Sequence, residues 1–102
     1  MQIYITILRI CYVTASPYIL RKSGHECKSS DLMLGIFSSV EECAEACTNK
    51  MGCVYFIFGN MALFGVNYCF WEQTSHVSCP EGWKPDDLLK GYDFYEIVTS
   101  GI

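Results

Sequence analysis

The chain has 102 residues, of which seven are cysteine and 51% are hydrophobic, so it is too apolar for a disordered tail. This length permits one domain and excludes a two-domain enzyme, because a domain commonly takes about 100 to 150 residues. The net charge is −4, and an acidic surface repels phosphate, so we expect no nucleic-acid partner.

Residues 1–24 form an apolar N-terminal segment that has more than one interpretation. Arg9 disfavours a stable membrane span, since an arginine near the centre of a span costs at least about 2.5 kcal/mol. One interpretation is a cleaved secretory leader, with Val13 and Ala15 as small residues before the cleavage point. Another is an extra strand, because residues 3–8 alternate as in a half-buried strand. The third interpretation is a poorly formed remnant of upstream sequence.

A capping box predicts that a helix starts at Ser39. The Ser39 hydroxyl can accept a hydrogen bond from the Glu42 amide, while the Glu42 carboxylate accepts one from the Ser39 amide. Good helix formers continue to Thr48. Cys43 and Cys47 are four residues apart, so they lie on the same face of this helix.

Two strands rich in β-forming residues follow the helix, over residues 53–58 and 67–73. Gly59 and Gly65 mark the connection as a turn, which predicts an antiparallel hairpin. A last strand is expected over residues 92–97. The predicted fold class is therefore α+β, with a single helix packed on a small antiparallel β-sheet and stapled by disulfides.

Six cysteines form an even set within the predicted domain, while Cys11 stands apart and its pairing stays open. An even set favours disulfides and an oxidising compartment. Only one pair has the close spacing of zinc ligands, so we expect no metal and no cofactor. A helix with two cysteines on one face, laid over a hairpin with one cysteine per strand, predicts two bridges, and elimination leaves a third: Cys47–Cys53, Cys43–Cys69 and Cys27–Cys79.

Between residues 25 and 98 the chain carries, in order, the runs SVEECAEAC, GCVYFIF, YCFWEQTSHVSCPEGW and YDFYEI. Together they resemble the apple or PAN module, in the variant common in extracellular proteins of single-celled eukaryotes. The resemblance implies a disulfide-bonded helix-on-sheet domain over residues 25–98, secreted or on the extracellular surface, that binds protein or carbohydrate. Many apple modules place their sixth cysteine within the last strand, whereas Cys79 precedes it.

The sequence contains few of the motifs that catalysis requires. It has no glycine-rich phosphate loop, no nucleophile elbow and no pair of histidines at metal-ligand spacing. The disulfide framework also oxidises the cysteines that could serve as nucleophiles. We therefore expect that the protein is not an enzyme.

The outer face of the hairpin is the predicted ligand site. If Cys53 and Cys69 point toward the helix, alternation along the strands places three side chains in the core: Tyr55, Ile57 and Trp71. The opposite face is then strongly aromatic, and it is either covered by loops or the N-terminal strand or able to bind a sugar ring or a protein. The candidate ligand-binding residues are Phe56, Tyr68, Phe70, Glu72, Trp83 and Lys84.

The expected function is that of a non-catalytic extracellular recognition module for a protein or carbohydrate ligand, for example in adhesion. One alternative is a secreted inhibitor or effector that acts on a target enzyme through residues 74–91. Another is a structural spacer in a longer chain. The sequence names neither the ligand nor the oligomeric state.

Overall fold

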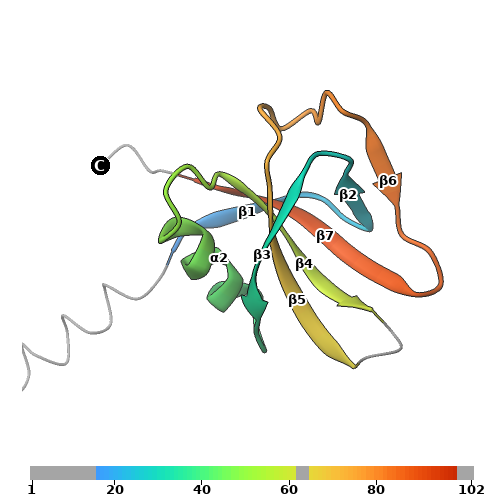
Figure 1. Cartoon of the computed structure of the whole chain (residues 1–102), viewed down its shortest axis with the longest axis horizontal. Coiled ribbons are helices and arrows are strands. Elements are labelled where there is room, and N and C mark those ends of the chain that lie inside the picture. The colour runs from blue at the N-terminus through green and yellow to red at the C-terminus, as the bar shows by residue number, and fades with distance from the viewer. Residues whose placement is uncertain (1–15, 62–64, 99–102) are drawn as a thin grey trace, which may run out of the picture.

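The computed structural model describes residues 16–61 and 65–98 (Figure 1). Over these residues the chain forms one helix and seven strands. In chain order they are β1 (Tyr18–Lys22), β2 (His25–Cys27), β3 (Asp31–Ile36), α2 (Val40–Thr48), β4 (Tyr55–Met61), β5 (Val66–Glu72), β6 (Trp83–Pro85) and β7 (Lys90–Ile97). The strand expected over residues 3–8 lies outside the described residues.

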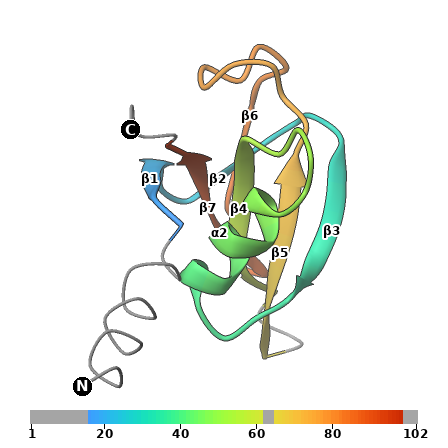
Figure 2. The ribbon, with the colours of Figure 1, turned by 90° about the vertical axis from the view of Figure 1, so that its left-hand side faces the viewer.

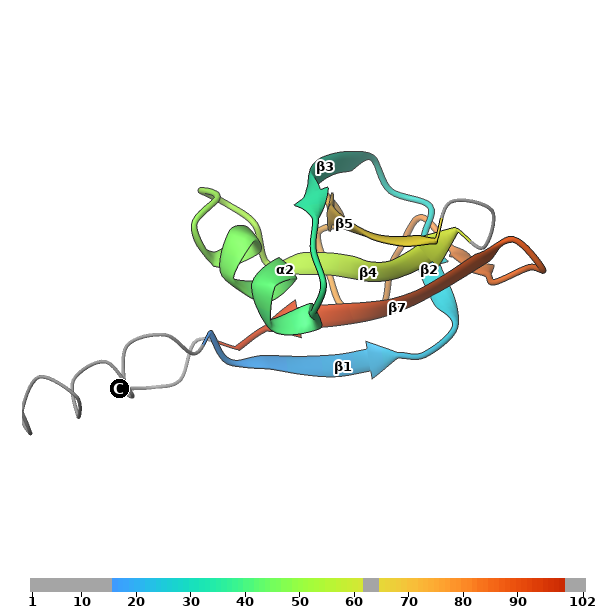
Figure 3. The same cartoon turned by 90° about the horizontal axis from the view of Figure 1, so that it is seen from below.

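Five strands form the main sheet in the order β1-β7-β4-β5-β3, and each neighbouring pair is antiparallel (Figure 3). The expected hairpin is present as β4 and β5, whose register runs from Tyr55 opposite Glu72 to Met61 opposite Val66. Because β1 is an edge strand of this sheet, the folded unit begins before the expected boundary at residue 25. The remaining strands, β2 and β6, form a separate two-stranded sheet.

The helix α2 starts where the capping box predicts. The Glu42 amide donates to Ser39 Oγ at 3.3 Å, and the Ser39 amide donates to Glu42 Oε1 at 3.2 Å. The helix lies across one face of the main sheet and buries Cys43, Ala44 and Cys47 there (Figure 2). The fold is therefore the expected α+β arrangement of a helix on an antiparallel sheet.

The phase of β4 differs from the sequence prediction. Phe56 is fully buried in the core beneath the helix, although it was expected to face outward, and Phe58 packs against the same core. Tyr55 and Ile57 belong instead to the core on the opposite face. The prediction was wrong because it counted the alternating directions of the side chains from Cys53. Cys53 precedes the first residue of β4 and lies outside the regular pleat.

In β5 the alternation agrees with the prediction. Trp71 packs against the core beneath the helix, together with the buried Cys69. Tyr68 and Phe70 point to the opposite face and pack against the second core. The two strands of the hairpin thus send aromatic side chains to both faces of the sheet.

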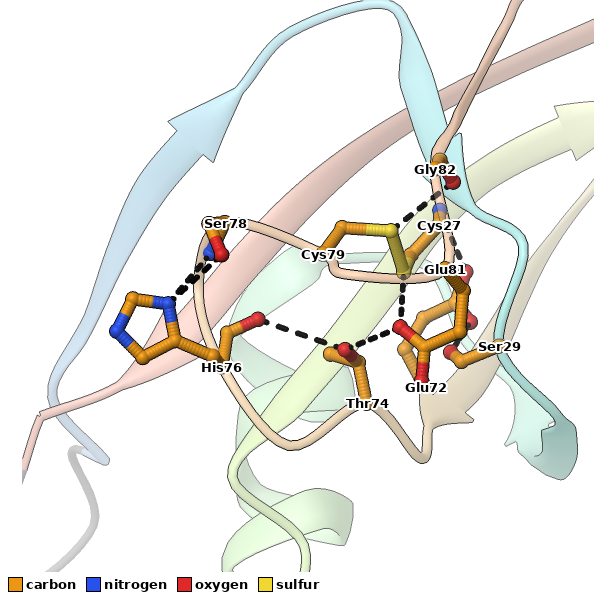
Figure 4. Close-up of a disulfide and its surroundings, with 9 residues drawn as sticks. All are labelled: Cys27, Ser29, Glu72, Thr74, His76, Ser78, Cys79, Glu81 and Gly82. Carbon is orange, nitrogen blue, oxygen red and sulfur yellow. Dashed lines mark hydrogen bonds between the residues drawn. A yellow bond between two sulfur atoms is a disulfide. The ribbon is translucent and has the colours of Figure 1, made fainter.

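Three disulfides hold the layers together, with Cα–Cα distances of 5.3 to 5.8 Å. They are the pairs expected from the sequence: Cys43–Cys69, Cys47–Cys53 and Cys27–Cys79. The first joins α2 to β5, and the second joins α2 to the turn before β4. The third joins β2 to the segment that precedes β6 (Figure 4).

A cover formed by residues 25–27 and 73–85 shields part of the sheet face opposite the helix. Its Trp83 ring meets the Phe94 ring edge-on, with centroids 4.9 Å apart. Beneath the cover lies the second core, which includes the buried side chains of Ile57, Phe94 and Tyr92. In the part of the chain that the structure describes, no helix is long and apolar enough to cross a bilayer.

Candidate functional site

The cover leaves one area of the sheet face open, and four apolar side chains form a patch there. Met33 on β3 lies opposite Phe70 on β5, and Ile36 lies opposite Tyr68, so each pair shares a face of the sheet. Met33 is 48% exposed and Ile36 is 56% exposed. The Tyr68 and Phe70 rings are half-buried, with centroids 6.2 Å apart. We call these four residues the apolar patch.

A cavity of about 140 Å³ adjoins the apolar patch, and Phe70 belongs to both. Ile57 and Tyr92 are almost completely buried and form the floor of the cavity. The other residues that line it come from β2, β3, β4 and β7: Glu26, Asp31, Met61 and Lys90. Its walls thus combine an apolar floor with two carboxylates and one ammonium group, and we call it the acidic cavity.

The strands β4 and β7 approach each other closely in the same area, and this approach requires a glycine at position 59. It lies in register with Tyr68 on one side and Tyr92 on the other. A Cβ atom at this position would stand 1.8 Å from the carbonyl oxygen of Gly91. Glycine therefore permits β4 and β7 to pair here. As a result, β4 carries no side chain at the position between Tyr68 and Tyr92.

A third carboxyl group, that of Glu72, lies next to the cavity but is fully buried. Carboxyl oxygens of Glu26, Asp31 and Glu72 all lie within 4.8 Å of one another. Glu72 accepts hydrogen bonds from the Cys27 amide at 3.1 Å and from Ser29 Oγ at 2.8 Å (Figure 4). Glu72 therefore ties the start of the cover to β5 and does not contact solvent.

Burial is the main cause that raises the pKa of Glu72, to about 9, and the nearby Asp31 carboxylate adds to it. Burial also raises the pKa of Glu26, while Lys90 and Lys84 oppose that rise. The pKa of Tyr92 is raised to about 12, first by burial and then by the negative charge of Glu26. The raised pKa favours the protonated form of Glu72 at neutral pH.

Two groups of side chains could be considered as metal ligands. Carboxylate oxygens suit Ca²⁺, but Glu72 is fully buried and already accepts two hydrogen bonds, which leaves Glu26 and Asp31 as ligands. In the second group, Glu81 Oε1 lies 3.5 Å from Cys27 Sγ and accepts from Thr74 Oγ1 at 2.7 Å. The cysteines of that group form a disulfide, so they provide no thiolate. Neither donor set fits a metal centre.

The structure brings three of the six candidate ligand residues near the open area. Tyr68 and Phe70 belong to the apolar patch. Lys84 is exposed on β6 and lies opposite Glu26 in the pairing of β2 with β6. These three side chains remain candidates for contact with a ligand.

The other three candidate ligand residues are buried or partly buried in the fold. Phe56 is buried beneath the helix because β4 has the opposite phase, and Glu72 is buried beside the cover. Trp83 is partly buried against Phe94, and Lys22 Nζ lies 5.4 Å from its ring centroid. Expecting Phe56 and Glu72 to contact a ligand was wrong, since neither has exposed surface.

Several residues of the open area were not predicted from the sequence: Glu26, Asp31, Met33, Ile36 and Lys90. The apolar run DLMLGI indicates a strand over residues 31–36, and this signal could have located β3. Nothing in the sequence, however, brings β2 and β3 to one cavity with β7, because β7 lies more than 50 residues further along the chain.

Comparison with known proteins does not assign the chain to a family. No protein-family model matches the chain, and no curated protein or solved structure matches it. The resemblance to apple and PAN modules thus rests on the sequence motifs alone. The three disulfides in a small domain are consistent with an extracellular protein.

Proposed function

We propose that this chain is a non-catalytic extracellular recognition module that binds a protein or carbohydrate ligand through the apolar patch and the acidic cavity. The observation that carries the proposal is that the cover shields only part of the sheet face. Two aromatic rings and two exposed aliphatic side chains stay open beside a cavity with charged walls. Binding sites commonly combine an apolar surface with a few polar groups that orient the ligand.

Support for a non-catalytic role comes from the oxidation state of the sulfur atoms. All six cysteines in the described part of the chain are paired in disulfides, so none of these six is a thiol nucleophile. Support for a secreted or cell-surface location comes from the same bridges and from the resemblance to apple and PAN modules. Such modules are rigid bodies that suit recognition.

A ligand screen with matched variants tests the proposal. The secreted chain is applied to a glycan array and to immobilised extracellular proteins, and hits are remeasured with the double variant Met33→Ser/Ile36→Ser. Because both side chains are exposed, the variant should fold normally and lose most of the binding. The control is Met51→Ser, since Met51 is 94% exposed but lies in the turn after α2. Equal binding by the two variants would refute the proposed surface.

A second candidate function is that of an inhibitor or effector that acts on a target enzyme, and Leu88 favours it. Leu88 is 96% exposed, in the segment between β6 and β7. The turn around it is braced by Asp87 Oδ1, which accepts from the amides of Leu89 at 2.8 Å and Lys90 at 3.1 Å. Inhibition of a protease panel that is lost in Leu88→Ser would support this candidate. No effect in either screen would leave the role of a structural spacer.

A further inference from the structure

The charge of the acidic cavity is not balanced by close ion pairs. In residues 16–61 and 65–98, the ion pair within 4 Å is Arg21–Glu96, which joins β1 to β7 away from the cavity. Glu26 and Asp31 make no such pair, although Lys90 and Lys84 are both close enough to oppose the rise in the pKa of Glu26. Two carboxylates thus face a cavity with an apolar floor and keep acceptor capacity for a ligand.

The apolar patch extends this cavity along the sheet. Phe70 lines the cavity and also lies opposite Met33, while Tyr68 next to it lies opposite Ile36. The surface therefore offers a polar position with two carboxylates and the Lys90 ammonium group and, directly beside it, an apolar position. A ligand that fits both must carry a cationic group next to an apolar one.

We infer that the acidic cavity takes the lysine or arginine side chain of a protein partner, and that the apolar patch takes an apolar residue beside it in the partner's chain. This inference rests on the proposed function and narrows it to one class of ligand. The alkyl stem of a lysine or arginine can cover Ile57 and Phe70, while its charged end donates hydrogen bonds to Glu26 and Asp31. The ring of Phe70, at the wall, adds a favourable contact for a cation.

Other occupants satisfy these positions less well. A sugar has hydroxyl groups over most of its surface, and the exposed Met33 and Ile36 side chains offer them no hydrogen-bond partner. A divalent cation would use the carboxylates but would leave the apolar patch without a role. A basic protein segment uses both features, because charge complementarity selects its basic residue and burial of its apolar residue adds affinity.

An array of short synthetic peptides tests the inference on the full chain. The peptides share apolar flanking residues and differ at one central position, which is Lys, Arg, Ala or Glu. We expect binding to the Lys and Arg peptides to exceed that to the Ala peptides by about tenfold or more, as expected for charged hydrogen bonds. Raising the ionic strength from about 0.01 M to about 0.15 M should reduce this difference.

Variants of the protein then locate the effect. Glu26→Gln should remove most of the preference for Lys and Arg, whereas Glu45→Gln on the exposed side of the helix should leave it unchanged. If Glu26→Gln misfolds, as judged by its circular dichroism spectrum, Met33→Ser should still weaken binding of every peptide. Equal binding of the Lys and Ala peptides, or of the wild type and Glu26→Gln, would overturn the inference.

Two outcomes separate this inference from the proposed function. Binding of a glycan that depends on Met33 and Ile36, without any preference for Lys or Arg, would overturn the inference and leave the recognition function intact. Binding of Ca²⁺ alone that is lost in Glu26→Gln would overturn it as well, because the cavity would then be a cation site.

Discussion

The buried Glu72 should make the stability of this protein depend on pH. Its side chain has no exposed surface, and burial raises its pKa from 4.5 to about 9. In the unfolded chain the group is ionised above about pH 4.5, whereas in the folded chain it stays protonated. A raised carboxyl pKa means that the folded state binds more protons, so stability falls as the pH rises through this window.

The substitution Glu72→Gln removes this titration and keeps the shape of the side chain. The amide oxygen can still accept from Ser29 or the Cys27 amide, and the amide nitrogen can donate to Asp31. Each pH unit within the window changes the free energy of unfolding by up to about 1.4 kcal/mol. Between about pH 5 and about pH 8, the wild type should therefore lose a few kcal/mol relative to the variant.

Urea denaturation followed by circular dichroism, with the disulfides intact, measures this difference. The two proteins should be close in stability near about pH 5, and Glu72→Gln should be the more stable near about pH 8. Glu45→Gln is the control, since its exposed side chain should leave the pH profile parallel to that of the wild type. Parallel profiles for the wild type and Glu72→Gln would refute the reasoning, because they would show that Glu72 is ionised in the fold.

Three further predictions concern the framework. Gly59→Ala should lower the free energy of unfolding by about 1 to 3 kcal/mol or more, because its Cβ would meet the carbonyl oxygen of Gly91 at 1.8 Å. Gly91→Ala should be tolerated, since its nearest neighbour lies at 3.9 Å, and equal losses in urea would contradict this account. Ser39→Ala should cost about 1 kcal/mol through loss of the cap, measured by thermal melting; an unchanged melting temperature would contradict the cap. Replacing Cys47 and Cys53 by alanine should lower the free energy of unfolding by about 2 kcal/mol. This loss should be the smallest for the three bridges, because the Cys47–Cys53 bridge closes the shortest loop, with a separation of 6 residues. A larger loss than on removal of Cys27–Cys79 would contradict this prediction.

Features that depend on neighbouring residues were accessible from the sequence. The capping box at Ser39 predicts the start of α2, because its two hydrogen bonds join residues three apart. The turn glycines predict the hairpin of β4 and β5. The positions of Cys43 and Cys47 on one face of the helix, beside the predicted hairpin, predict two of the bridges, and elimination gives the third.

The candidate site, in contrast, depended on the tertiary structure. Phe56 faces the helix because β4 starts at Tyr55, and a shift of one residue in that start exchanges the two faces of a strand. The acidic cavity forms where Glu26 and Asp31 meet Lys90, which comes from a strand that is distant in sequence from the other two. Local patterns determine which elements form, whereas long-range pairing and the position of the cover decide which side chains are buried and which remain exposed.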